Sequence, residues 1–441
     1  MNFKKILILS LCALSGGMVA SAFASDTISL SRHRCIEIAL DSSPTVKVAD
    51  LEVKRMQYAK KETRGGLFPT IDFQAAYQRS IELQTIHMNM GGQTQSLKMG
   101  SDNTWNFGFN ASLPIIAPTL WKAISINDTQ ILASLESARS SRLDLINNIN
   151  KSYYALLLAI ASKDVIQQNY DRALLNHQIY EKQFAAGTAS EYDVLRSSVQ
   201  VTNLEPELLQ ADIAIRQCEL QLKVLMGIDY DITVTPNITL EEMQQEMYGY
   251  NPLAAEDLSA NSSLRSLDIQ SDLARKNVAL KKLAWIPTLG ASFNISWLSL
   301  SDGSPFKNQQ FSPYSNVGLA LSVPIFSGGS KYYGLKQAQV QANELSLQRE
   351  NLVNSLTMQR DLALDNINRE VKQISSSAEG MKQAAKAYDI MQKSFEIGAA
   401  SYLDLRDSEV ANTSAKLSYL QCIYNYLVSV SELDLLLGKE M

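Results

Sequence analysis

The chain has 441 residues, more than a single hydrophobic core usually organises. Hydrophobic residues make up 46% of it and charged residues 19%, a balance that excludes both an intrinsically disordered chain and a bundle of membrane-spanning helices. The formal net charge of −5 argues against a general nucleic-acid binder, because contacts with the phosphate backbone require an excess of cationic side chains.

The first 24 residues have the pattern of a secretory signal peptide. Lys4 and Lys5 form a positive start, an apolar run follows over 6–13, and the small-x-small sequence at 22–24 fits a cleavage site. An uncleaved membrane anchor is the alternative, which the small residues that end the segment disfavour. We therefore expect an exported protein from which the signal peptide 1–24 is removed.

The first half of the chain, 25–227, is predicted to contain a short helix, two strands and two long helices. Pro44 suits the first position of a helix, where the missing N–H of proline costs no hydrogen bond. The step Phe68-Pro69 ends that helix, because a residue before proline avoids the helical conformation. Strict alternation of apolar and polar residues then marks two strands, separated by a long polar loop at 84–103. The predicted elements are helices 44–65, 119–185 and 188–226 and strands at about 70–83 and 104–116.

The second half, 258–441, shows these signals again in the same order. Its first helix ends at Ile286-Pro287, and a polar loop at 301–314 separates two alternating strands. The intervening segment, 228–257, contains two prolines and a glycine and is predicted to be an irregular link between the halves. The predicted elements are helices 263–284, 330–396 and 399–437 and strands at about 287–300 and 315–327.

Each predicted strand places aromatic and aliphatic residues on one face and small or polar residues on the other. One interpretation is an antiparallel sheet that covers a core in water. The other is a membrane barrel with an apolar outer face, in which Tyr77, Trp105 and Trp297 suit an interfacial aromatic belt. Four strands cannot close a barrel, since even small closed barrels need about eight. The sheet is therefore either open or completed by strands of further chains.

The long helical segments are predicted to form coiled-coil rods. Neither 120–184 nor 330–395 contains proline, and at 1.5 Å per residue each reaches about 100 Å. In the returning helix of the first half, ten residues recur with alternating spacings of three and four, which is the seam of a coiled coil. Pro206 lies within this helix and is predicted to kink or break it. The seam consists of Val194, Ser197, Val201, Leu204, Leu208, Ala211, Ile215, Cys218, Leu222 and Leu225.

The two halves align without a gap where their long helices turn back. Residues 184–227 match residues 395–438 at 13 of 44 positions, where ordinary residue usage predicts roughly three matches. A chain built as two copies of one long unit makes architecture, and not a catalytic pocket, the first question about its function.

The order and spacing of these motifs resemble the TolC family of outer-membrane efflux proteins. The resemblance is carried by the motif F-x-x-G-x-x-S-x-x-D-L at 395–405, by its earlier twin at 184–194 and by the turn at 323–329, and it covers nearly all of the chain after the signal peptide. It implies an α+β membrane protein with two tandem structural repeats per chain. In such a protein a trimer forms a 12-stranded antiparallel β-barrel, four strands from each chain, which continues as a long α-helical coiled-coil barrel.

The resemblance implies a passive exit channel in the cell outer membrane that extends into the periplasm and serves a tripartite efflux or type I secretion system. The implied partners are two further copies of the chain in a homotrimer, outer-membrane lipid, a periplasmic adaptor protein and an inner-membrane pump of the RND, ABC or MFS type, and no nucleic acid. A stand-alone outer-membrane diffusion porin is the alternative function, although a porin needs no helical extension of about 100 Å. The sequence identifies neither the exported substrate nor the pump.

The turns between the long helices have a role in the family. The resemblance implies that Gly187 and Gly398, with Ser190 and Ser401, form the periplasmic tip turns to which an adaptor docks. Near the second turn, Asp404 and Asp407 match positions of inward-facing carboxylate rings, which would favour cations at a narrow aperture. The alternative for both aspartates is that they are solvated residues stabilised by the dipole at a helix N-terminus.

Closure of the tip is expected to differ from the family pattern. Asp193 matches a position that helps to lock the closed tip through contacts between helices. Its aromatic partner in the family is tyrosine, but this chain has Phe395, which lacks the hydroxyl group, and Ala400 replaces a nearby arginine. We therefore place Asp193 and Phe395 at the gate and expect Arg196 or Arg406 to pair with Asp193 or with a neighbouring aspartate.

No catalytic, cofactor-binding or metal site is predicted, and we expect no enzyme. The three histidines, His33, His87 and His177, lie in different segments, and the sequence has no nucleophile triad, phosphate loop or zinc-ligand spacing. His87 is followed by Met88 and Met90, a combination that suits soft metals, but methionine in a polar loop is more often incidental. Three cysteines follow the signal peptide, an odd number without metal-ligand spacing, which indicates buried or incidental thiols.

Overall fold

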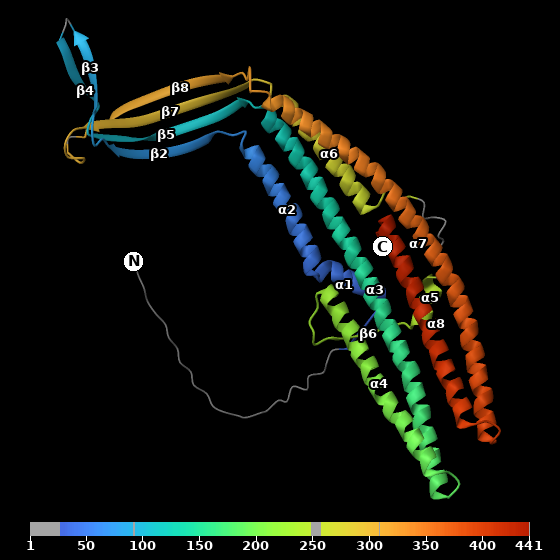
Figure 1. Cartoon of the computed structure of the whole chain (residues 1–441). Coiled ribbons are helices and arrows are strands. Elements are labelled where there is room, and N and C mark those ends of the chain that lie inside the picture. The colour runs from blue at the N-terminus through green and yellow to red at the C-terminus, as the bar shows by residue number, and fades with distance from the viewer. Residues whose placement is uncertain (1–26, 91–92, 248–256, 308, 441) are drawn as a thin grey trace, which may run out of the picture.

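The computed structural model describes residues 27–90, 93–247, 257–307 and 309–440, so the predicted signal peptide lies outside the described residues. The molecule is elongated, with a β-sheet at one end and helices that run from it to the opposite end (Figure 1). The longest helices form two hairpins that lie side by side, with their turns at the end far from the sheet. No helix in the described part of the chain is long and apolar enough to cross a membrane.

The same order of elements occurs twice along the chain, namely a shorter helix, a strand pair, a very long helix and a returning helix. The helices of the first half are α2 (Pro44–Gly65), α3 (Pro118–Ala185) and α4 (Glu191–Met226), and those of the second half are α6 (Ser262–Leu283), α7 (Ser330–Glu396) and α8 (Tyr402–Leu437). Proline stands in the first turn of α2 and of α3, where a backbone N–H would have no partner within the helix. Helix α3 has 68 residues and α7 has 67, so each extends for about 100 Å.

Helix α4 packs along α3 through the predicted heptad seam. Ser197, Val201 and Leu204 are buried and the other seam residues are at least half-buried, which confirms the periodicity. The predicted break at Pro206 is wrong, because α4 continues through this residue. Pro206 and Thr202, whose carbonyl group loses its helical donor, are both exposed, so water can hydrate that carbonyl.

The hydrophobic core lies at the middle of the molecule, where short elements pack on the long helices. These elements are β1 (Thr27–Leu30), α1 (Arg32–Ser42), β6 (Thr233–Pro236) and α5 (Leu240–Met247), and β1 pairs with β6 in parallel. Cys35 and Cys422 are buried here, and burial raises the pKa of the Cys35 thiol to about 11, which keeps it protonated and unreactive. The largest fully buried side chains of the core are Ile149, Tyr153, Tyr154, Leu156, Leu222, Met226, Leu240, Ile423, Leu427, Val430 and Leu433.

The prediction of an irregular link at 228–257 is wrong for the part that the structure describes. Strand β6 has four residues and α5 has eight, and elements this short do not develop a readable hydrophobic period. The remainder of the predicted link, 248–256, lies outside the described residues.

Four strands form one antiparallel sheet in the order β2–β5–β7–β8. Their bounds are β2 (Thr70–Arg79), β5 (Asn103–Ile116), β7 (Thr288–Ser301) and β8 (Ser312–Ser322). The register pairs Phe73 with Phe109, Phe109 with Ile295 and Phe293 with Val317, so the apolar residues of all four strands share one face. Among the described residues this face is largely uncovered, and Val317 is 78% exposed, although Phe306 and Phe311 pack on the rings of Trp105 and Phe107 at one end. An apolar surface of this extent requires lipid or another protein surface.

The predicted polar loop at 84–103 is wrong. Two strands, β3 (Gln84–Met90) and β4 (Gln93–Met99), form an antiparallel hairpin that projects beyond the sheet (Figure 1). The sequence contains the signal for it, since two alternating segments flank a Gly-Gly pair, but the polar composition outweighed that signal. The bounds of two strands also differ from the prediction, because β2 ends at Arg79 and β8 begins at Ser312 and ends at Ser322.

A buried ion pair fastens α4 to the short parallel sheet. Lys223 is fully buried, and its Nζ lies 2.7 Å from Glu219 Oε1 and donates a hydrogen bond to the Tyr230 carbonyl oxygen at 3.1 Å. Glu219 Oε1 also accepts a hydrogen bond of 3.1 Å from the backbone N–H of Val234 in β6. Burial alone raises the pKa of Glu219, but the hydrogen bonds from Lys223 and Val234 outweigh it and lower this pKa below its usual value.

Removal of one member of this pair is expected to cost more than removal of both. Glu219→Leu leaves the Lys223 ammonium buried without its counter-charge, so we expect the free energy of unfolding to fall by about 3–5 kcal/mol. Glu219→Leu combined with Lys223→Met leaves no buried charge and should cost clearly less. Guanidinium-induced unfolding of the detergent-solubilised protein measures both, and an equal loss in the single and double variants would contradict the role of the ion pair.

Candidate gate at the hairpin tips

Both hairpin turns are built around a glycine in the left-handed conformation. Gly187 has φ of +72° and Gly398 has φ of +74°, values that side-chain-bearing residues rarely adopt. The N–H of Thr188 donates to the Gln183 carbonyl and the N–H of Ala399 to the Ser394 carbonyl, each at 2.8 Å. These bonds from the residue after glycine to the last helical turn make both turns Schellman motifs, which end α3 and α7.

The returning helices both begin with a capping box. Ser190 Oγ accepts a hydrogen bond from the backbone N–H of Asp193 at 3.3 Å, and Asp193 Oδ2 accepts bonds from the Ser190 N–H at 3.1 Å and from the Ser190 hydroxyl at 2.6 Å. Ser401 and Asp404 form the same three bonds at the start of α8. The Ser-x-x-Asp matches between the halves are therefore explained by helix capping.

The capping bonds also keep these aspartates charged. Hydrogen bonds from the Ser190 hydroxyl and backbone lower the pKa of Asp193, and those from Ser401 lower the pKa of Asp404. Asp404 and Asp407 are exposed at the tip, one helical turn apart on α8. The structure thus brings Ser401, Asp404 and Asp407 together at the end of one hairpin, and Ser190 with Asp193 at the end of the other.

An aromatic cluster joins the two hairpins close to these turns. The ring of Tyr402 in α8 lies 5.7 Å from the ring of Tyr180 in α3 and 6.2 Å from that of Phe395 in α7, both edge to face. The guanidinium carbon of Arg196 in α4 lies 4.7 Å from the Tyr402 ring centroid. Tyr402 of α8 therefore contacts one residue from each of α3, α4 and α7. Burial in this cluster raises the pKa of Tyr180 to about 12.

The expected pairing of Arg196 or Arg406 with an aspartate is wrong. Neither arginine forms an ion pair with an aspartate among the residues that the structure describes. Arg196 stacks on Tyr402 because the carboxylate of Asp193 is already held in its capping box. Phe395, which lacks a hydroxyl, contributes only its ring, and that contact is with Tyr402 of its own hairpin.

A second cluster joins the hairpins further from the tip. The guanidinium carbon of Arg172 in α3 lies 5.0 Å from the ring centroid of the buried Tyr388 in α7. Glu409 of α8 is only 6% exposed, and burial raises its pKa, against the opposing charges of Arg172 and Arg406. In the described part of the chain, Glu409 Oε1 and Asn412 Oδ1 are buried without a hydrogen-bond donor. Neither this cluster nor the role of Tyr402 was predicted from the sequence, because spacing along one helix does not reveal the register between helices.

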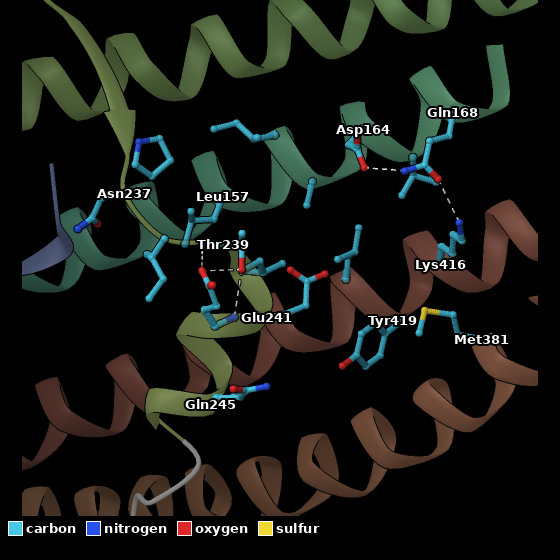
Figure 2. A pocket seen from close by; sticks show the side chains of 18 of the residues that line it. Leu157, Asp164, Gln168, Asn237, Thr239, Glu241, Gln245, Met381, Lys416 and Tyr419 are labelled. Carbon is cyan, nitrogen blue, oxygen red and sulfur yellow. Dashed lines mark hydrogen bonds between the residues drawn. The ribbon is translucent and has the colours of Figure 1, made fainter. Parts of the chain in front are cut away.

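A large hollow lies beside α5 and not at the tip. It has a volume of about 1110 Å³ and is lined by α3, α8, the β6–α5 segment and Met381 of α7 (Figure 2). Lys416 donates to Gln168 Oε1 at 3.2 Å, and Gln168 donates to Asp164 Oδ2 at 2.8 Å. Its described lining contains no serine, cysteine or histidine, and the hydroxyl of its Thr239 donates a hydrogen bond to Glu242 Oε2 at 3.0 Å at the start of α5.

The histidines have structural contacts or lie on the surface. His177 of α3 shares a hydrogen bond of 2.9 Å with the seam residue Ser197, and His33 lies 3.3 Å from Glu37 one turn further along α1. His87 is exposed on β3. Among the described residues, no three histidine, cysteine or acidic side chains lie close enough together to hold a metal ion.

Glu409 is expected to make the stability of the protein depend on pH. A carboxyl whose pKa is raised in the folded state stabilises that state when protonated, and this stability is lost as the pH rises above 4.5, its ordinary value, and through the raised pKa. Glu409→Gln stays neutral, so its melting temperature should increasingly exceed that of the wild type as the pH is raised from about 4 to about 8. Glu379→Gln, which changes an exposed residue of α7, is the control, and parallel melting profiles for Glu409→Gln and wild type would contradict the buried carboxyl.

Both halves of the chain match a known protein family. The family model described as outer membrane efflux protein matches residues 35–228 and 253–439. Outer membrane protein TolC of Escherichia coli is 23% identical over 395 residues, which cover 82% of this chain and 78% of TolC.

Solved structures agree in fold along nearly the whole chain. A crystal structure of CusC, from a study of its folding and transmembrane channel formation, superposes with a TM-score of 0.75 at 19% identity, covering 94% of this chain and 93% of CusC. The CmeC outer membrane channel of Campylobacter jejuni superposes with a TM-score of 0.74 at 16% identity, covering 98% of this chain and 94% of CmeC. Since the family model spans both halves, including both hairpins and the sheet, the chain belongs to the family of outer membrane efflux proteins.

Proposed function

We propose that this protein is a passive exit duct in the outer membrane for a tripartite efflux or type I secretion system. The observation that carries the proposal is the direct continuation of the four-stranded sheet into α3 and α7, two helices of about 100 Å that each turn back into a hairpin. A sheet with an apolar outer face suits lipid, and the hairpins can carry a conduit across the periplasm. A stand-alone porin would have no use for the hairpins, so this alternative has less support.

The proposed working form is a homotrimer built from two tandem repeats per chain. Strands β2 and β8 form the edges of the sheet, and within the described chain neither has a partner on its outer side. Three copies would join these edges into a 12-stranded antiparallel barrel, which exceeds the roughly eight strands that closure requires. The rings of Tyr77 and Trp105, 4.4 Å apart, and that of Trp297 would then lie in an interfacial belt at the end of the barrel far from the helices.

The proposed partners are a periplasmic adaptor and an inner-membrane pump, which supplies the energy. Gly187 and Gly398 have open space around their Cα atoms, so another protein can approach the backbone of both turns closely. With Ser190 and Ser401 they form the proposed docking surface for the adaptor. The pump would determine the substrate, since the chain itself offers a duct and no specific pocket at the tip.

Asp404 and Asp407 are the proposed aperture residues. Three copies of each would place up to six carboxylates at one constriction, where they attract cations and repel anions. The capping box does not oppose this role, because it keeps Asp404 ionised and leaves it exposed. Asp193 has the same cap in the first hairpin, and its proposed contribution to the gate is to hold the start of α4, from which Arg196 projects.

Neutralisation of the aperture is expected to reduce cation selectivity. The wild-type protein should form cation-selective channels in planar lipid bilayers, and Asp404→Asn with Asp407→Asn should shift the reversal potential in a salt gradient towards zero. Asp229→Asn, at an exposed position beyond α4 and remote from the tip, is the matched control. Unchanged selectivity in the double variant would refute the aperture assignment, and a complete absence of channels from the wild type would refute the duct itself.

A further inference from the structure

We propose that two arginine–tyrosine clamps, Arg196 on Tyr402 and Arg172 on Tyr388, hold the two hairpins of each chain together in the closed tip. The proposal rests on the gated-duct function, and it names the residues that close a tip in which Phe395 cannot donate a hydroxyl hydrogen bond. Each clamp takes its arginine from the first hairpin and its tyrosine from the second.

The geometry of both clamps is that of a cation over the face of an aromatic ring. The guanidinium carbons lie 4.7 Å and 5.0 Å from the ring centroids, within the range of about 6 Å over which the ring quadrupole attracts a cation. Tyr388 is 6% exposed and Tyr402 is half-buried, so both pairs are partly withdrawn from water, which strengthens the attraction. Tyr180 packs edge-on against Tyr402 and fixes the ring that Arg196 covers.

The contacts within the first hairpin differ in kind from the contacts between the two hairpins. Within the first hairpin, Ala173 of α3 packs on Val201 and Leu204 of α4 in a small apolar cluster. Between the hairpins at this level the contacts are aromatic, polar and charged, including the hydrogen bond from Lys416 to Gln168. At this level the surface between the hairpins can therefore separate without exposing a large apolar area, while the apolar core at mid-height keeps the two hairpins joined.

The polar cluster beside the inner clamp makes the closed arrangement reversible. Glu409 Oε1 and Asn412 Oδ1 are buried without donors among the described residues, and separation of the hairpins would let water reach both. Such atoms oppose closure, so the closed state needs attractive contacts at the same level to offset them. Arg172 on Tyr388 stands next to these atoms, and Arg196 on Tyr402 lies closer to the turn.

Single-channel conductance of the purified full-length protein in planar bilayers tests the clamps. Arg196→Gln and Arg172→Gln remove the cation and keep side-chain length, so each should raise the open fraction about three- to fivefold, and the pair on the order of tenfold. Tyr402→Leu removes the contact with Arg196 and also the ring contact with Tyr180, so it should raise the open fraction at least as much as Arg196→Gln. Arg196→Gln should add nothing further in the Tyr402→Leu background, because its contact is already lost. Tyr402→Phe keeps the ring face and should behave as wild type, whereas Tyr388→Phe also removes a hydroxyl that is hydrogen-bonded to Arg172 and should fall between wild type and Arg172→Gln.

The controls separate failure of the clamps from failure of the duct. Arg275→Gln changes an exposed arginine of α6 and should leave the open fraction unchanged. Circular dichroism of every variant checks that the helices are retained. Wild-type channels with an unaltered open fraction in both arginine variants would overturn the clamps and leave the duct standing. An open fraction raised by Tyr402→Phe as much as by Tyr402→Leu would also overturn them, since the hydroxyl and not the ring would then carry the contact.

Discussion

The four-stranded sheet, with its one continuous apolar face and its two unpaired edges, is the constraint on which the rest of the molecule depends. Backbone N–H and C=O groups along β2 and β8 need partners, and the apolar face needs an environment without water. The described residues of a single chain provide neither partners for these strand edges nor full cover for the apolar face. These two features support the proposal that further copies of the chain and lipid complete the fold.

The helices meet a different constraint, which is to stay straight over about 100 Å and still permit movement at the far end. The long helices satisfy the first part through apolar seams within each hairpin and through the core at mid-height, where side chains such as Tyr153 and Leu427 are fully buried. The second part depends on the tip, where Schellman turns and capping boxes keep each hairpin end rigid. Movement is then left to the surface between the hairpins near the tip, where the contacts are rings, charges and incompletely bonded polar atoms.

Features with a strong local period could be predicted from the sequence, and features set by contacts between distant elements could not. The seam from Val194 to Leu225 and the alternating strands follow from spacing alone, and the helix-turn-helix repeats are marked by Gly187 and Gly398. The short elements β6 and α5 have too few residues for a period, and a Gly-Gly hairpin signal at β3–β4 was overlooked. The continuity of α4 through Pro206 depends on the exposure of that residue, which spacing did not settle.

At the candidate gate, individual residues could be identified from the sequence, but the interactions between their side chains could not. Asp193 and Asp404 were predicted from their match to family positions. The Ser-x-x-Asp pattern is also that of a capped helix start, but it was not used, so the hydrogen bonds of these aspartates to Ser190 and Ser401 were not foreseen. Arg196 was expected to form an ion pair with an aspartate. It lies instead over the ring of Tyr402, because the carboxylate of Asp193 is already held in its capping box. Which residues of α3 and α8 face each other depends on the packing register of two helices more than 200 positions apart in the chain.

Native mass spectrometry of the detergent-solubilised protein tests the central claim most directly, namely that the sheet is closed by copies of the same chain. Three chains, each bringing four strands, should give one species with three times the mass of the processed chain. A stable monomer would contradict the account, because the edges of β2 and β8 would then remain open. A stable dimer would contradict the trimer while preserving closure, since eight strands are about the minimum for a barrel.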